Sequence, residues 1–112
     1  MKRILYLFLE NGPHALKVLE TVKDSGFNGT LVGAASIKHA LEEKLPEEHS
    51  FFSLYNWEAE SDKESTFSMY IVEEEHLAPL KQAIRAATKD FREVKGAMFS
   101  LPIEDYEGTL TV

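Results

Sequence analysis

Residues 66–91 read TFSMYIVEEEHLAPLKQAIRAATKDF, and this stretch changes from the period of a strand to the period of a helix. In its first part, Phe67, Met69 and Ile71 alternate with the residues between them, which predicts a β-strand. Glu73-Glu74-Glu75 then places negative charge where the start of a helix favours it. The helix itself is predicted from apolar side chains at helical spacing, namely Leu77, Leu80, Ile84, Ala87 and Phe91.

The chain before this stretch has the same succession of strand and helix. Residues 3–9 form an apolar run in which both faces of a strand are apolar, so a central position in a sheet is expected. Helical spacing from His14 to Ser25 predicts a helix, and Gly26 stands where a C′ glycine belongs. In the later helix, Lys89 and Arg92 are expected in the last turns, where cations complement the helix dipole.

The remaining elements complete a repeated order. Residues 31–35 are small and β-branched and predict a strand, and Ser36 is a candidate N-cap for a short helix from Ile37 to Lys44. A last strand is predicted from Gly96 to Leu101. The order β-α-β followed by β-α-β predicts an α+β chain with a ferredoxin-like split β-α-β fold (βαββαβ). This fold is a four-stranded antiparallel sheet with two helices on one face.

Composition limits the class of protein. The chain has 112 residues, no cysteine and a formal net charge of -7 at pH 7. This length predicts a single domain over residues 1–112. The lack of cysteine excludes disulfides and thiolate sites and fits a reducing compartment, so a cytoplasmic location is expected. The negative charge disfavours nucleic acid as a partner, and no apolar stretch is long enough for membrane insertion.

Two helices cover only one face of such a sheet, whereas these strands carry apolar residues on both faces. An uncovered apolar face would exceed what monomers usually expose. The aromatic segment Phe51–Trp57 can fold over the second face, or another subunit can cover it. We expect self-association, with the aromatic segment contributing. The alternative is that the segment alone completes a monomeric core.

The chain resembles the PII-like superfamily, the relatives of the nitrogen-regulatory PII signal proteins. The matching features are the opening strand Lys2–Tyr6, the helix end at Ser25-Gly26-Phe27 and the start of the second strand at Gly29-Thr30-Leu31-Val32. The closing stretch Gly96–Asp105, with Pro102 followed by a branched residue and acids, is the most family-like piece. The resemblance covers nearly the whole chain and rests on pattern.

The resemblance implies a homotrimer that binds a small anionic effector, such as an adenine nucleotide, in clefts between subunits. It also implies that the long loop at about 36–65 contacts a protein partner. The family holds nucleotide phosphates with a glycine-rich loop before its closing strand. Here that stretch, Lys89–Gly96, has one glycine, and the arginines that follow the family's closing strand are replaced by residues 106–110.

Six residues are the candidates for ligand contact. Arg92 and Lys95 are cations near the family's phosphate loop, although a charged helix terminus in solvent is the simpler interpretation. Gly29 and Thr30 border the cleft that the family uses, although they also suit a turn and a closely packed strand. The complete set is Gly29, Thr30, Ser36, Arg92, Lys95 and Gly96.

The residues give little support to other chemistry. No serine has the context of a catalytic nucleophile, so an enzyme is not expected. His39 with Glu42 and Glu43, together with His49, offers nitrogen and oxygen ligands, but a mixed polar helix face is the preferred interpretation. Three hypotheses remain: a PII-like sensor, a ligand-free interaction module, and a metal-binding trimer that resembles the divalent-cation-tolerance proteins. No cofactor is identified.

Overall fold

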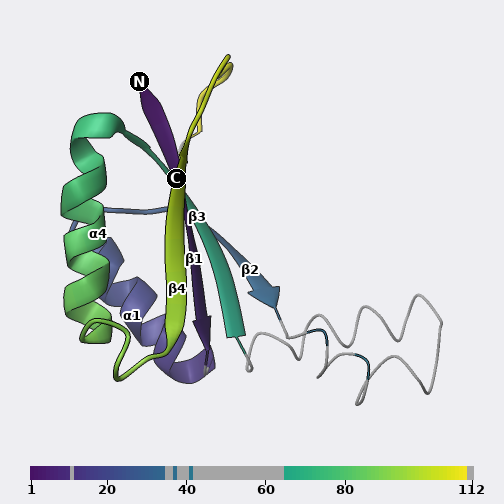
Figure 1. Ribbon diagram of the computed structural model, residues 1–112, viewed down its shortest axis with the longest axis vertical. Helices are drawn as coiled ribbons and strands as arrows, with labels where there is room; N and C mark the ends of the chain where they lie inside the picture. Colours follow the sequence, from purple (N-terminus) through teal and green to yellow (C-terminus); the bar gives the residue numbers. More distant parts are fainter. Residues whose placement is uncertain (11, 35–36, 38–40, 42–64, 111–112) are drawn as a thin grey trace.

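The computed structural model describes residues 1–10, 12–34, 37, 41 and 65–110 of the chain. Within them, four strands form one antiparallel sheet in the order β2-β3-β1-β4, which confirms the predicted ferredoxin-like α+β fold (Figure 1). The elements are β1 (Lys2–Glu10), α1 (Gly12–Asp24), β2 (Thr30–Ala34), β3 (Ser65–Glu73), α4 (Glu74–Thr88) and β4 (Gly96–Pro102).

Parts of the prediction lie outside the described residues. The aromatic segment Phe51–Trp57 and the candidate ligand residue Ser36 are among them. Of the short helix predicted from Ile37 to Lys44, only Ile37 and Leu41 are described, and both are helical.

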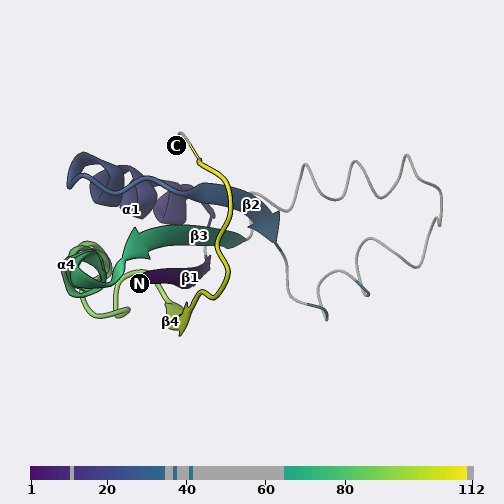
Figure 2. The same ribbon diagram turned by 90° about the horizontal axis from the view of Figure 1, so that it is seen from above.

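The alternation in the strands separates the two faces of the sheet as predicted. Leu5, Leu7 and Leu9 of β1 are buried beneath the helices, where they form the core with residues such as Leu80 and Ile84 of α4. Both helices lie on this one side (Figure 2). The opposite side, called here the open face, carries the other row of each strand. Its residues are Ile4, Tyr6, Phe8, Thr30, Val32, Phe67, Met69, Ile71, Ala97, Phe99 and Leu101.

The end of α1 is formed as the sequence predicted. Gly26 has a φ of 104°, a conformation in which a Cβ atom is unfavourable. Its N–H donates to the carbonyl of Lys23 at 2.9 Å, and the N–H of Phe27 donates to the carbonyl of Val22 at 3.3 Å. These two bonds define a Schellman motif, which satisfies carbonyls that the helix end leaves unpaired. Phe27 also packs against the core that contains Val22.

The end of α4 differs from the prediction. The helix ends at Thr88, so Lys89 and Arg92 are not in its last turns. Lys89, Asp90 and Phe91 instead have φ values of 56°, 57° and 61°, which form a left-handed turn of three non-glycine residues. Such residues are costly in this region and persist only when the surroundings hold them.

Thr88 is the residue that holds this turn. Its side chain is fully buried, and its Oγ1 donates to the carbonyl of Ile84 at 2.9 Å and accepts the N–H of Phe91 at 3.0 Å. Phe91 packs against the core, so its side chain also favours the turn. The apolar side chains at helical spacing predicted that the helix continues to Phe91. Instead, the two hydrogen bonds of the buried Thr88 hydroxyl stabilise a turn after Thr88.

The substitution Thr88→Val tests this role, because valine keeps the shape and removes both hydrogen bonds. We expect it to lower the free energy of unfolding by about 1–3 kcal/mol, since the N–H of Phe91 loses its buried acceptor. Urea denaturation at fixed protein concentration measures the change. Thr21→Val is the matched control, because the Thr21 hydroxyl also donates to a helix carbonyl, that of Lys17 at 3.0 Å, but on an exposed surface. Equal effects of the two substitutions would show that Thr88 has no special role.

Candidate functional site

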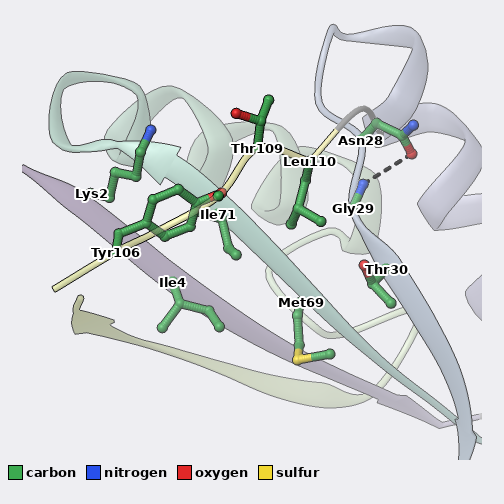
Figure 3. Close-up of a pocket in the computed structure, with 11 residues that line it drawn as sticks. Lys2, Ile4, Asn28, Gly29, Thr30, Met69, Ile71, Tyr106, Thr109 and Leu110 are labelled. Carbon is green, nitrogen blue, oxygen red and sulfur yellow. Dashed lines mark hydrogen bonds between the residues drawn. The ribbon is translucent and has the colours of Figure 1, made fainter. Parts of the chain in front are cut away.

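A cavity of about 550 Å³ lies between the open face and the C-terminal segment of the chain, defined as Glu104–Leu110 (Figure 3). We call it the tail pocket. Figure 2 shows the segment crossing the sheet on the side away from the helices, from β4 towards β2. The pocket is lined by Lys2, Ile4, Asn28, Gly29, Thr30, Met69, Ile71, Tyr106, Gly108, Thr109 and Leu110.

The C-terminal segment is attached to the sheet at its beginning. The N–H of Ile103 donates to the carbonyl of Lys2 at 3.0 Å, which continues the pairing of β4 with β1. Asp105 and Gly108 then have φ values of 52° and 102°, so the backbone changes direction on both sides of Tyr106. The Tyr106 ring lies 5.0 Å from the Nζ of Lys2, a distance suited to a cation–π contact. This contact links the C-terminal segment to β1 at the edge of the pocket.

Charged groups gather at this end of the sheet. The Nζ of Lys2 donates to Glu73 Oε2 at 2.6 Å, and the N-terminal amine lies 4.0 Å from the other oxygen of Glu73. The hydrogen bond to Glu73 raises the pKa of Lys2, and the same bond lowers the pKa of Glu73. Arg3 Nη1 lies 3.6 Å from Glu74 Oε1. Three cationic groups thus lie close to two carboxylates at this end of the sheet, and the C-terminal segment adds the carboxylates of Glu104, Asp105 and Glu107.

Gly29 and Thr30, both predicted as ligand contacts, line the tail pocket. Gly29 has a structural reason to be glycine, because a Cβ atom there would overlap the backbone carbonyl of Met69. The N–H of Gly29 donates to Asn28 Oδ1 at 2.9 Å (Figure 3). The local backbone therefore brings β2 close to β3 and sets the position of Thr30 at the pocket edge.

Arg92, Lys95 and Gly96 lie elsewhere. They belong to the connection into β4 and to its first residue, at the opposite edge of the sheet from β2. Three strand spacings separate these edges, or about 14 Å. Gly96 also pairs with Leu9 near the far end of β1, whereas the pocket lies near its start. Within one copy the structure does not bring the candidate residues together.

The connection before β4 uses its backbone amides internally. Five successive N–H groups donate to acceptors of α4 or of the connection itself: Lys89 to Ala86, Asp90 to Arg85, Phe91 to the Thr88 hydroxyl, Arg92 to Lys89 and Glu93 to Thr88. The Arg92 side chain is also engaged, since its Nε donates to the carbonyl of Lys89 at 3.1 Å. In this conformation residues 89–93 offer no row of free amides of the kind that binds a phosphate.

Most residues of the tail pocket carry no signal in the sequence that predicts a site. Lys2 and Tyr106 stand near the two ends of the chain, and residues 103–110 have no periodic pattern that would place them on the sheet. The basic pair Lys2-Arg3 was the one local signal of charge at this site. A second hollow of about 540 Å³ between the helices, lined by residues such as His14, Lys17 and Glu93, was also not predicted.

In the part of the chain that the structure describes, no group of three or more histidine, aspartate or glutamate side chains is placed to hold a metal. The candidate set around His39 and His49 lies outside that part. None of the described helices is long and apolar enough to cross a membrane.

Solved structures share this fold. A PII-like protein from Thiomonas intermedia K12 named CPII, whose structure is bound to ADP, AMP and acetate, is 19% identical, with 88% of this chain and 82% of that chain covered and a TM-score of 0.53. A putative PII-like signalling protein from Thermus thermophilus is 17% identical, with 90% and 86% covered and a TM-score of 0.52. A functionally unknown protein from Pediococcus pentosaceus ATCC 25745 is 12% identical, with 96% and 97% covered and a TM-score of 0.59.

No protein-family model matches the sequence, and no curated protein matches it. The likeness therefore lies in the arrangement of the strands and helices over most of the chain, at sequence identities of about one residue in five or less. This chain has the fold of the PII-like signalling proteins.

Proposed function

We propose that this chain is a non-enzymatic regulatory protein of the PII-like type that works as a homotrimer in the cytoplasm. It acts as a single domain over residues 1–112. It binds a small anionic effector between copies and relays that binding to a protein partner through the loop at about 36–65. The observation that carries the proposal is the combination of a PII-like fold with a sheet face on which apolar side chains such as Phe8, Phe99 and Leu101 are exposed among the described residues.

The open face supports self-association. Four aromatic rings from three neighbouring strands form a cluster on it, which we call the aromatic cluster: Tyr6, Phe8, Phe67 and Phe99. Their ring centroids lie 4.7–6.2 Å apart. Phe8 is 42% exposed and Phe99 is 48% exposed. Exposed aromatic groups of this kind are typical of protein interfaces, where they supply most of the binding energy.

Assembly also explains the distribution of the candidate ligand residues. Gly29 and Thr30 lie at the β2 edge of the sheet, and Arg92, Lys95 and Gly96 lie at the β4 edge. Two opposite edges of one sheet can face each other only when they come from different copies. An effector held between copies would then be contacted by Gly29, Thr30 and Ser36 of one copy and by the cations of the next.

The effector is proposed to be an anion because Arg92 and Lys95 are exposed cations on that edge. Adenine nucleotides are the first candidates, since structures of the CPII protein are bound to ADP and AMP. Calorimetric titration of the full chain with ADP tests the proposal. Lys95→Ala is expected to weaken binding about tenfold, because a charge-assisted hydrogen bond contributes roughly 1.5–3 kcal/mol. Lys23→Ala, which removes an exposed lysine near the end of α1, is the control.

One observation favours a second function, a ligand-free interaction module. The amides of residues 89–93 are all paired within the chain, so this loop lacks the amide cradle that would hold a phosphate. In that case the protein acts through its surfaces alone. A panel of adenine nucleotides and inorganic anions that produces no change in melting temperature would favour the module over the sensor.

A further inference from the structure

We infer that the hollow between α1 and α4 binds a small zwitterion with an apolar body, that is, an apolar amino acid or a short apolar peptide. Its volume of about 540 Å³ lies in the range of roughly 300–1,000 Å³ typical of small-molecule sites. The hollow is formed within one copy on the helix side of the sheet (Figure 2), so the inference goes beyond the proposed function and does not depend on it. We call it the helix hollow: its floor is Val18, Ala87 and Val94, and its rim is His14, Lys17, Thr21 and Glu93.

The floor of the helix hollow is apolar and is part of the core. Val18 and Val94 are buried, with 4% and 7% of their surface exposed, and both belong to the hydrophobic core. Ala87 is half-buried and packs against the same core. This floor favours a ligand with a compact apolar body, because covering apolar surface is a general source of affinity.

The rim carries opposite charges on its two walls. Lys17 comes from α1, and Glu93 comes from the connection that follows α4. Within the described residues, no salt bridge includes either side chain, so the two do not pair across the hollow. A ligand that carries both a carboxylate and an ammonium can pair with both walls at once, because charge-assisted hydrogen bonds form with either group.

The surroundings of the helix hollow carry no excess of either charge. With His14 counted as neutral, residues 10–20 and 89–95 contain four cationic side chains and four carboxylates. They are Lys17, Lys89, Arg92 and Lys95, and Glu10, Glu20, Asp90 and Glu93. Arg85 of α4 is engaged elsewhere, since its Nη2 donates to Gln82 Oε1 at 3.3 Å. Balanced charges favour a zwitterion, because they give no net field that would attract an anion or a cation.

The backbone of both walls is fixed by hydrogen bonds. The N–H of Glu93 donates to the carbonyl of Thr88 at 3.2 Å, within the turn that the Thr88 hydroxyl stabilises. On α1, the Thr21 hydroxyl donates to the carbonyl of Lys17 at 3.0 Å, so it keeps lone pairs that can accept from the ammonium of a ligand. Walls that are in place before the ligand arrives lower the entropic cost of binding.

The test uses leucine and its dipeptide leucylleucine, each titrated into the full isotope-labelled chain and followed by NMR. We expect saturable shifts of the methyl groups of Val18, Ala87 and Val94, and the tighter of the two probes assigns the ligand as an amino acid or a peptide. For leucine, 4-methylpentanoate and 3-methylbutylamine keep the apolar body and lack the ammonium or the carboxylate. Each is expected to bind about tenfold more weakly than leucine.

Three outcomes of the titration would overturn the inference. The first is the absence of saturable shifts with both probes. The second is a set of shifts confined to the Gly29 amide and the Met69 methyl group, which would place the probe in the tail pocket. The third is equal binding of leucine and 4-methylpentanoate, which would leave Glu93 without a role.

Variants separate the two walls. Lys17→Met and Glu93→Gln are each expected to weaken binding of the tighter probe about tenfold, because each removes one charge-assisted contact. Lys23→Met, which removes an exposed lysine of α1 outside the hollow, is the matched control and is expected to leave the affinity unchanged. Ala87→Trp, which fills the floor, is expected to abolish binding.

The exposed positions decide the question if Ala87→Trp fails to fold, since unchanged affinity in both Lys17→Met and Glu93→Gln would overturn the inference. Lys95→Ala is expected to weaken binding of ADP and to leave the affinity for the tighter probe unchanged. The inference and the proposed function therefore fail separately.

Discussion

Replacing Phe8 with aspartate is expected to convert the proposed trimer into a monomer while the fold is retained. Phe8 lies in the aromatic cluster and is 42% exposed in one copy, so its side chain is not needed by the core beneath the helices. In an assembly built on the open face, the aspartate would be buried among aromatic rings without a partner. Burying an unpaired carboxylate costs several kcal/mol, and each copy of the trimer would carry one. Light scattering after size exclusion measures the mass.

Leu16→Asp provides the matched control for Phe8→Asp. Leu16 is 47% exposed, close to the value for Phe8, but it lies on α1 on the other side of the sheet. We expect Leu16→Asp to remain trimeric. Dissociation by both substitutions would indicate a general effect of added charge, and dissociation by Leu16→Asp alone would place the interface on the helices.

Gly96→Ala is expected to produce the second large effect, a loss of stability of about 3 kcal/mol, within the range typical of severe overpacking. Gly96 pairs with Leu9 at the start of β4, and a Cβ atom built on it would overlap the backbone carbonyl of Phe8. A backbone atom cannot move aside as the end of a flexible side chain can. The sheet itself would have to shift, and β4 would lose part of its pairing with β1. Urea denaturation at fixed protein concentration measures the loss.

Gly108→Ala is the control for this prediction. A Cβ atom on Gly108 would meet nothing within 4 Å, so its cost comes only from the φ of 102°. That cost is expected to be about 1 kcal/mol. A loss of stability at Gly96 no larger than that at Gly108 would mean that β4 can adjust to a side chain at its first residue.

The sequence predicted the fold because its local signals agree with one another. The alternation of Phe67, Met69 and Ile71 defines the open face, and the opposite alternation in residues 3–9 defines the core. Gly26 marks the end of α1 by a rule that depends only on backbone conformation. Each of these signals acts over a few residues, which is the range that periodicity and capping rules cover well.

The end of α4 could not be predicted in this way. Phe91 continues the apolar stripe of the helix, and Lys89 and Arg92 suit a helix C-terminus, so the sequence favours a helix that continues past Thr88. The structure instead has a left-handed turn, held by the two hydrogen bonds of the buried Thr88 hydroxyl and by the packing of Phe91. Tertiary contacts of this kind override local propensity and leave no pattern in the sequence.

The candidate site was predicted only in part. Gly29 and Thr30 line a real pocket, but its cation, Lys2, and its aromatic wall, Tyr106, come from the two ends of the chain. Rules based on the spacing of residues along the sequence do not relate two residues as far apart as Lys2 and Tyr106. Arg92 and Lys95 were grouped with Gly29 through the resemblance to PII-like proteins, and within one copy they lie at the opposite edge of the sheet. Only the proposed assembly of several copies would bring these residues together, and a single sequence does not encode assembly in any local pattern.

Native mass spectrometry of the full chain, as purified, decides whether the protein assembles, because it counts the copies and detects any small molecule that remains bound. We expect a trimer, held through the open face and its aromatic cluster. A trimer with added mass would also identify the class of effector. A monomer over the concentration range of the measurement would rule out the proposed trimer, since it would show that the open face is not an interface between copies.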